Sequence, residues 1–234
     1  MIAIMKRELS AYFTSATAYV VLALFLFSSG LLFNISTFGS NSTSFYVAFM
    51  WMFFVVVFIV PIITMKSFAD EKRRKTDQAL LTSPVSLVEI VTGKFLGAFL
   101  LYAIGTGIFL IYGVVVSFFA KLEWSVLLCS VLGFLLLGAA LIAVNVFISS
   151  LTESTVVAAV AGMGFALAVI LIYFFVNNVS VEWIAAVLQK INLMGYYENF
   201  IYGILSVSDV VFFLSLTALF LFFTGRSLDR RRWS

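Results

Sequence analysis

The sequence predicts an all-α integral membrane protein with six transmembrane helices. Of its 234 residues, 63% are hydrophobic and only 11% are charged, and the mean hydropathy of +1.16 lies outside the range of soluble domains. Apolar runs long enough to cross a hydrocarbon core of about 30 Å as a helix recur along the chain. Stretches such as residues 50–61 and 131–143 are apolar on every side, whereas the strands of a membrane barrel alternate apolar and polar residues. A helical bundle is therefore favoured over a barrel.

Six apolar runs define the predicted spans. They comprise residues 17–38, 45–65, 95–119, 125–149, 155–176 and 209–224. The last run is the shortest, and its ends are the least sharply defined. Together the runs are expected to form a single transmembrane domain over residues 1–234.

The positions of the 14 Lys and Arg residues predict the orientation of the chain. If the N-terminus lies on the inner side of the membrane and the six helices cross it in succession, twelve of these residues fall on the inner side. The other two, Lys121 and Lys190, fall on the outer side. Because basic residues are retained on the cytoplasmic side, we expect a protein of the cytoplasmic membrane with both termini cytoplasmic. Its basic residues are expected to face the lipid bilayer rather than nucleic acid. The inner set comprises Lys6, Arg7, Lys66, Lys72, Arg73, Arg74, Lys75, Lys94, Arg226, Arg230, Arg231 and Arg232.

Residues 1–15 are predicted to form an amphipathic helix that lies along the inner membrane surface. At about 100° per residue, apolar and polar side chains separate onto two faces, with Ile4 as the exception. The alternative is a basic tail that merely precedes the first span. The apolar face comprises Ile2, Met5, Leu9, Tyr12 and Phe13, and the polar face comprises Lys6, Arg7, Ser10 and Thr14.

Residues 177–208 are too polar to span a membrane and too apolar for a free loop. We expect one or two short helices there, forming a re-entrant element that dips into the outer leaflet and packs on the bundle. Aromatic and acidic side chains in this element suit the membrane interface and could contact an extracytoplasmic accessory protein. The candidate residues are Glu182, Trp183, Tyr196, Tyr197, Glu198 and Phe200, with Tyr202 as a further interfacial aromatic residue.

The charged loop at residues 66–94 separates the second and third spans. Its pattern predicts a helical extension over residues 66–81, a break over 82–85, and a short helix over 87–94 that enters the third span. Ser86 and Glu89 form a capping-box pattern, which favours a helix start at this point. The local pattern fits a helix that docks onto a partner and a turn at the membrane surface about equally well.

Small residues recur at four-residue spacing in two predicted helices. Ala158, Gly162 and Ala166 form one stripe, and Gly93 and Gly97 form a shorter one. Such stripes allow helices to approach closely, and packing within the chain is favoured over a dimer interface. Asn145, a polar residue deep in the fourth span, is expected to form a hydrogen bond between helices.

The sequence contains little that would support catalysis or ion-coupled transport. Histidine is absent, which excludes an HExxH zinc site. Apart from Asp209 and Lys94 at span boundaries, no Asp, Glu, Lys or Arg lies within a predicted span, whereas ion-coupled carriers place such groups at mid-membrane. Gly93-Lys94 lacks the earlier glycine and the following hydroxyl of a GxxxxGK[ST] phosphate-binding motif. We therefore expect a non-catalytic chain without a metal or cofactor of its own.

Three blocks of sequence resemble those of type-2 ABC-transporter permeases, in the same order along nearly the whole chain. Within that class the chain is most similar to the small permeases of the gliding-motility and nitrous-oxide-maturation type. The first block runs from Phe68-Ala69-Asp70-Glu71-Lys72-Arg73 through Leu80-Leu81-Thr82-Ser83-Pro84-Val85-Ser86 to Gly93-Lys94. The second is Ser149-Ser150-Leu151-Thr152-Glu153, and the third comprises Tyr197, Phe200, Gly203 and Asp209 with the ending from Leu219 to Trp233.

The resemblance implies a permease subunit that pairs with a second copy or a paralogue above two separate ABC ATPase subunits. ATP and magnesium would then be bound by the partner ATPase, and the short helix at 87–94 would be a cytoplasmic coupling helix. The residues expected to contact the ATPase are Leu81, Pro84, Val85, Leu87, Val88 and Glu89, with Glu153 as a secondary contact. Two alternatives are transmission of force to an extracytoplasmic partner without substrate transport, and an ATP-independent channel or carrier.

Overall fold

The computed structural model describes residues 1–39, 43–76, 86–176, 178 and 181–232. Helices are the only regular elements in these segments, and six helical stretches are long and apolar enough to cross a membrane. The all-helical, six-span prediction is therefore confirmed. The six stretches are Ala16–Thr37, Tyr46–Arg73, Leu87–Ser117, Trp124–Leu151, Thr155–Phe175 and Val207–Arg230.

The spans are built from the longer helices, and shorter helices lie at their ends. The N-terminal half contains α1 (Ile2–Thr14), α2 (Ala16–Phe33), the π-helical turn η1 (Asn34–Phe38), α3 (Tyr46–Thr64) and α4 (Ala69–Arg73). The third span comprises α6 (Leu87–Thr106) and α7 (Ile108–Ser117). The remainder comprises α8 (Trp124–Leu151), α9 (Thr155–Phe175), α10 (Glu182–Ile191), α11 (Leu193–Ile201) and α12 (Val207–Arg232).

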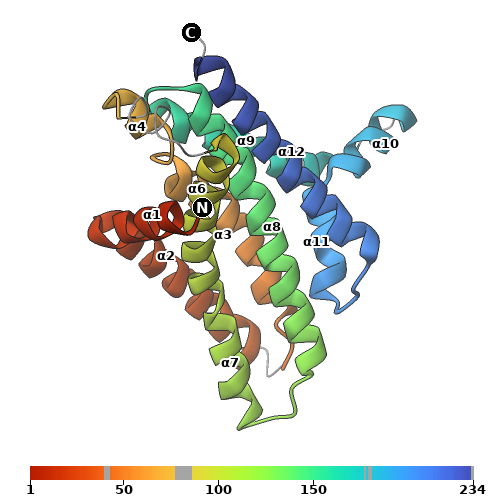
Figure 1. Ribbon diagram of the computed structural model, residues 1–234. Coiled ribbons are helices and arrows are strands. Elements are labelled where there is room, and N and C mark those ends of the chain that lie inside the picture. Colours follow the sequence, from red (N-terminus) through yellow and green to blue (C-terminus); the bar gives the residue numbers. More distant parts are fainter. Residues whose placement is uncertain (40–42, 77–85, 177, 179–180, 233–234) are drawn as a thin grey trace.

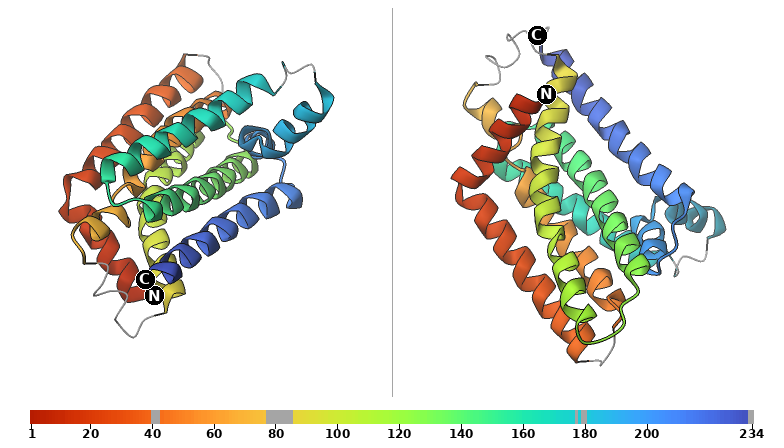
Figure 2. Two further views of the ribbon diagram at one scale, coloured as in Figure 1. Left: turned by 90° about the horizontal axis from the view of Figure 1, so that it is seen from above. Right: turned by 60° about the horizontal axis from the view of Figure 1, so that its bottom comes forward.

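The C-terminus and α4 lie at the same end of the bundle (Figure 1), and the right-hand view of Figure 2 shows that the N-terminus and the beginning of α6 also lie at this end. We call this the terminal end, and it also holds the turn between α8 and α9. The turn between α7 and α8 lies at the opposite end (Figure 1). Helix α8 runs through the middle of the bundle and packs against α12, α3, α6 and α11 (Figure 2).

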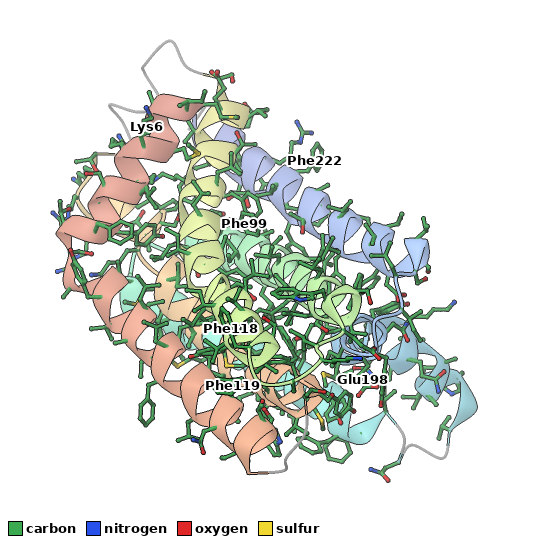
Figure 3. All side chains as sticks on the ribbon, turned by 90° about the horizontal axis from the view of Figure 1, so that it is seen from below. Lys6, Phe99, Phe118, Phe119, Glu198 and Phe222 are labelled. Carbon is green, nitrogen blue, oxygen red and sulfur yellow. The ribbon has the colours of Figure 1, made fainter. Side chains whose placement is uncertain are left out.

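Aromatic side chains from five helices form the centre of the core around Phe134 of α8. The Phe134 ring lies 6.1 Å from that of Phe25 on α2, 5.8 Å from Phe49 on α3 and 5.6 Å from Tyr102 on α6. Tyr197 of α11 adds a fifth ring at 6.1 Å. All five side chains are almost fully buried, so the interior is tightly packed, as the side chains between the ribbons in Figure 3 show.

The stripe of small residues on α9 packs within the chain, as predicted. Ala158, Gly162 and Ala166 are all buried. A Cβ atom added at Gly162 would lie 2.4 Å from Asn145 Oδ1 on α8 and 2.9 Å from Pro61 Cβ on α3, so only glycine allows this approach. The Asn145 amide donates to the Leu141 carbonyl of its own helix at 2.9 Å, rather than to another helix as expected.

Two predicted boundaries differ from the structure. The short helix expected at residues 87–94 is the beginning of α6, because no Gly or Pro break separates Lys94 from Phe95. The third span is instead interrupted at Gly107, within Gly105-Thr106-Gly107, where low helix propensity weakens the helix.

The single cysteine, Cys129, is buried within α8.

Candidate functional site

A cluster of charged side chains joins three helices at the terminal end. Lys94, in the second turn of α6, is only 1% exposed, and its ammonium lies 3.0 Å from Glu8 Oε1 on α1 and 2.9 Å from Glu71 Oε1 on α4. It also donates to the Ser67 carbonyl at 2.7 Å and lies 5.1 Å from the centre of the Phe68 ring. A buried charge is tolerated only when it is paired and hydrogen-bonded, so Lys94 holds the three elements together.

Arg7 covers the outer side of the same cluster. Its guanidinium lies 2.9 Å from Glu8 Oε1 and 3.0 Å from Glu71 Oε1, the two oxygens that accept from Lys94. The hydrogen bond to Glu8 raises the pKa of the Arg7 guanidinium, which is charged in any case. Two cations therefore share two carboxylates, and we call Arg7, Glu8, Glu71 and Lys94 the ion cluster.

Two glycines of α6 bring α1 close enough for these contacts. A Cβ atom added at Gly93 would lie 2.9 Å from Ile4 Cβ, and one at Gly97 would lie 2.8 Å from Glu8 Cβ. The predicted role of Gly93 and Gly97 in close packing is confirmed, with α1 as the partner. Ile4, the exception on the predicted amphipathic helix, therefore faces α6, whereas Ile2 is exposed.

Tyr12, near the end of α1, fixes the helix to the second span. Its side chain is buried, and its hydroxyl donates to the Ile63 carbonyl of α3 at 3.0 Å. Burial raises the pKa of the Tyr12 phenol. Helix α1 is thus packed along much of its length against the bundle.

Helix α4 is also attached to the end of α8. The Ser149 hydroxyl accepts from the backbone amides of Phe68 and Ala69, both at 3.2 Å, and donates to the Met65 carbonyl at 3.3 Å. The Lys72 ammonium donates to the Ser150 carbonyl. These contacts link the ion cluster to the turn between α8 and α9, which contains Glu153.

Of the residues predicted to contact an ATPase, those that the structure describes lie in the first turn of α6 and in the turn between α8 and α9. Leu87 is partly buried, Val88 is 69% exposed, and the side chain of Glu89 is exposed. The capping box is present: Ser86 Oγ accepts from the Glu89 amide at 3.3 Å, and Glu89 Oε2 accepts from the Ser86 amide at 3.4 Å. Glu153 is exposed at the same end. Leu81, Pro84 and Val85 lie outside the described residues.

Residues 181–201 form two short helices with different surroundings. On α11, Tyr197 and Phe200 are fully buried, and the Tyr197 hydroxyl donates to the Phe49 carbonyl at 3.3 Å. Tyr196 is partly buried and stacks on Phe212 with ring centres 4.0 Å apart. Because α11 packs on α8 and α3, Tyr197 and Phe200 belong to the core rather than to an exposed surface.

The more exposed candidates lie on or near α10. Trp183 is 71% exposed, and Val187 and Ile191, which lie on the same helix face, are also exposed. Glu198 on α11 is partly buried, and this burial raises the pKa of its carboxyl. The side chain of Glu182 lies outside the described set. Helix α10 therefore presents an apolar face that other described helices do not cover.

The ion cluster was missed by the sequence prediction, although one signal of it is present in the sequence. On a helical projection of α1, Glu8 falls between Ile4 and Tyr12, in the middle of the face that the structure buries. An acid in that position requires a buried cation. Lys94 is the matching cation in α6, and the prediction treated it only as a boundary residue.

The fold and the site define a membrane protein with six spanning helices and a charged, tightly connected terminal end. The family model for the ABC-2 family transporter protein matches residues 46–232, from α3 to the end of α12. The chain therefore belongs to this family, the permease component of ABC transporters. A comparison with curated proteins gives no significant match.

Proposed function

We propose that the chain couples ATP hydrolysis by a separate ABC ATPase to the movement of a substrate across the cytoplasmic membrane. The observation that supports this most strongly is the connection of α1, α4, α6 and the α8–α9 turn at the terminal end. A displacement applied there would be shared by five of the six spans. Helix α1 leads directly into the first span, α4 ends the second, α6 begins the third, and the α8–α9 turn joins the fourth and fifth. ATP and magnesium would be bound by the ATPase.

The terminal end is proposed to face the cytoplasm. Ten of the basic residues whose side chains are described belong to α1, to the segment from the end of α3 to Lys75, to the beginning of α6 or to the end of α12, whereas Lys121 precedes α8 and Lys190 lies on α10. This asymmetry supports cytoplasmic termini by the positive-inside rule. In this orientation the apolar part of α1 that is not packed on α6 would rest on the inner membrane surface as an interfacial helix.

The ATPase contact is proposed to centre on the beginning of α6. Leu87, Val88 and Glu89 would form its main part, together with Leu81, Pro84 and Val85 of the preceding segment. Glu153 in the α8–α9 turn would make a secondary contact with the ATPase. This turn is linked to α4, and so to the ion cluster on α6, through the hydrogen bonds of Ser149 and Lys72. The chain would act as one permease domain, paired with a second copy or a paralogue. The sequence likeness to gliding-motility and nitrous-oxide-maturation permeases suggests the subgroup.

Replacing Val88 with aspartate tests the proposed contact. Val88 is 69% exposed, so Val88→Asp leaves the core intact. Losing one buried valine from an interface removes about 1.5–3 kcal/mol, so we expect roughly a tenfold or greater loss of ATPase binding. The measurement is the amount of ATPase retained on the immobilised permease after purification in mild detergent, together with the ATPase rate.

Val207→Asp is the matched control, because Val207 is a valine that is 74% exposed at the beginning of α12, the helix whose other end lies at the terminal end. It should leave ATPase retention near the wild-type level. Equal retention by the two variants would show that the beginning of α6 is not the docking site.

Transmission of force to an extracytoplasmic partner is the second candidate function, and the exposed apolar face of α10 favours it. A partner that binds this face would be lost on Trp183→Asp, while ATPase stimulation by the permease would persist. Phe119→Asp is the control, since Phe119 is an aromatic residue that is 83% exposed in the turn between α7 and α8, outside residues 177–208. Substrate flux that survives Trp183→Asp in reconstituted vesicles would favour transport instead.

A further inference from the structure

A cavity of about 580 Å³ lies beside the ion cluster, between α1, α4 and the beginning of α2. Its lining holds four cations, Arg7, Lys66, Arg74 and Lys94, and three carboxylates. The formal charge of the lining is therefore +1, from four positive and three negative groups.

The excess positive charge is located at Lys66. Arg7 and Lys94 are paired with Glu8 and Glu71, and Arg74 lies 3.2 Å from Asp70. Within the described part of the chain, Lys66 makes no ion pair, and its ammonium donates to the Thr17 hydroxyl at 3.2 Å. Lys66 and Thr17 are therefore both available to an anion in the cavity.

The beginning of α2 adds hydrogen-bond donors beside Thr17. The first backbone amides of a helix have no acceptor within the helix. Ser15, the residue before α2, makes no side-chain cap to these amides. Ser15 and Thr17 both line the cavity, so the positive end of the α2 dipole faces it.

A buried hydroxyl in the wall also lacks a partner. Ser67 is only 4% exposed and lines the cavity, and its Oγ makes no hydrogen bond within the described part of the structure, as is also true of Glu71 Oε2 in the same lining. Buried hydroxyls are normally hydrogen-bonded. Lys66, which has no carboxylate partner among the described residues, and the beginning of α2, which has no side-chain cap, thus face one space that a negatively charged oxygen group would fill.

We propose that this cavity binds a phosphate group, and that the phosphate belongs to an anionic phospholipid of the surrounding leaflet. The choice of lipid follows from position, because α2 is a membrane span and the cavity lies where that span begins. Lipid phosphates lie at this level of a bilayer. Lys66, Thr17 and the first amides of α2 hold the phosphate, and Arg7 and Arg74, each paired with carboxylates, line the same cavity. The proposal does not depend on ATPase coupling.

The test uses the purified full-length protein in maltoside micelles with increasing amounts of dioleoyl phosphatidylglycerol, and native mass spectrometry measures the bound lipid. We expect one tightly bound lipid per chain in the wild type. Lys66→Gln and Thr17→Val should each weaken its binding, Lys66→Gln by about tenfold through loss of a charged hydrogen bond. In a second arm, inorganic phosphate replaces the lipid and its binding is measured by calorimetry.

Lys6→Gln is the matched control, because it removes the same charge from the same end, on the outer side of α1 and away from the cavity lining (Figure 3). Thermal unfolding of each variant in the same detergent shows that the fold is retained. Binding of inorganic phosphate alone, with the same dependence on Lys66 and Thr17, would support the site but assign it to a soluble phosphate. Equal weakening by Lys66→Gln and Lys6→Gln, with no effect of Thr17→Val, would overturn the proposal in favour of diffuse surface charge.

Discussion

Lys94→Met is expected to lower the free energy of unfolding by about 3 kcal/mol, because it leaves two carboxylates at a buried site with only one cation. The Lys94 ammonium pairs with Glu8 and Glu71, and the Lys94 side chain is only 1% exposed. Methionine fills a similar volume, which separates the loss of charge from the loss of packing. Thermal unfolding in detergent, followed by tryptophan fluorescence, measures the effect.

Lys66→Met provides the control for Lys94→Met. Lys66 lines the same cavity but is exposed and makes no ion pair among the described residues, so its loss should change stability by less than about 0.5 kcal/mol. Adding Glu71→Gln to Lys94→Met should restore part of the stability, since it removes one of the unpaired charges. If Lys94→Met unfolds at the wild-type temperature, the ion cluster does not hold the terminal end together.

Gly97→Val is expected to separate α1 from α6 and to destabilise the protein by about 2 kcal/mol through overpacking. The new side chain would start 2.8 Å from Glu8 Cβ, with the backbone of α1 directly behind it at Leu9. Helix α1 would therefore have to move as a whole. Trypsin should then cleave after Lys6 and Arg7 faster than in the wild type, and gel analysis of a digestion time course measures this. If the terminal end acts as one unit, ATPase stimulation should fall as well.

Gly164→Val makes the same substitution within a spanning helix at a position where a Cβ atom would meet nothing within 4 Å. It should leave both stability and the rate of cleavage in α1 close to the wild-type values. Similar cleavage of the two variants would mean that Gly97 has no special role in docking α1.

The spans could be predicted because their signal is local. The fourth was predicted at residues 125–149 and is found at Trp124–Leu151, since each apolar residue contributes to hydropathy whatever it touches. The sixth was predicted at 209–224, but α12 continues to Arg232. Hydropathy detects only the apolar part of a helix. The last turns of α12, which carry Arg226 and Arg230, are helical but polar, so the predicted span ended before them.

The site could be predicted only in part, because its main contacts join distant parts of the chain. The capping box of Ser86 and Glu89 is a local pattern and was found. The pairing of Lys94 with Glu8 depends on the close approach of α1 and α6, which the sequence indicates only through Gly93 and Gly97. The assignment of Ile4 as an exception followed from treating lipid as the partner of α1, whereas helix α6 is the partner.

The separation of the ion cluster along the chain affects how the protein is made. Glu8 and Lys94 are 86 residues apart, and Glu71 lies between them, so the cluster cannot form until the third span begins to leave the ribosome. Helix α1 is synthesised first, yet its partner surface at Gly93 and Gly97 is synthesised only after two complete spans. During biosynthesis α1 therefore cannot dock until the beginning of α6 has been made, and its docking joins the first three spans into one unit.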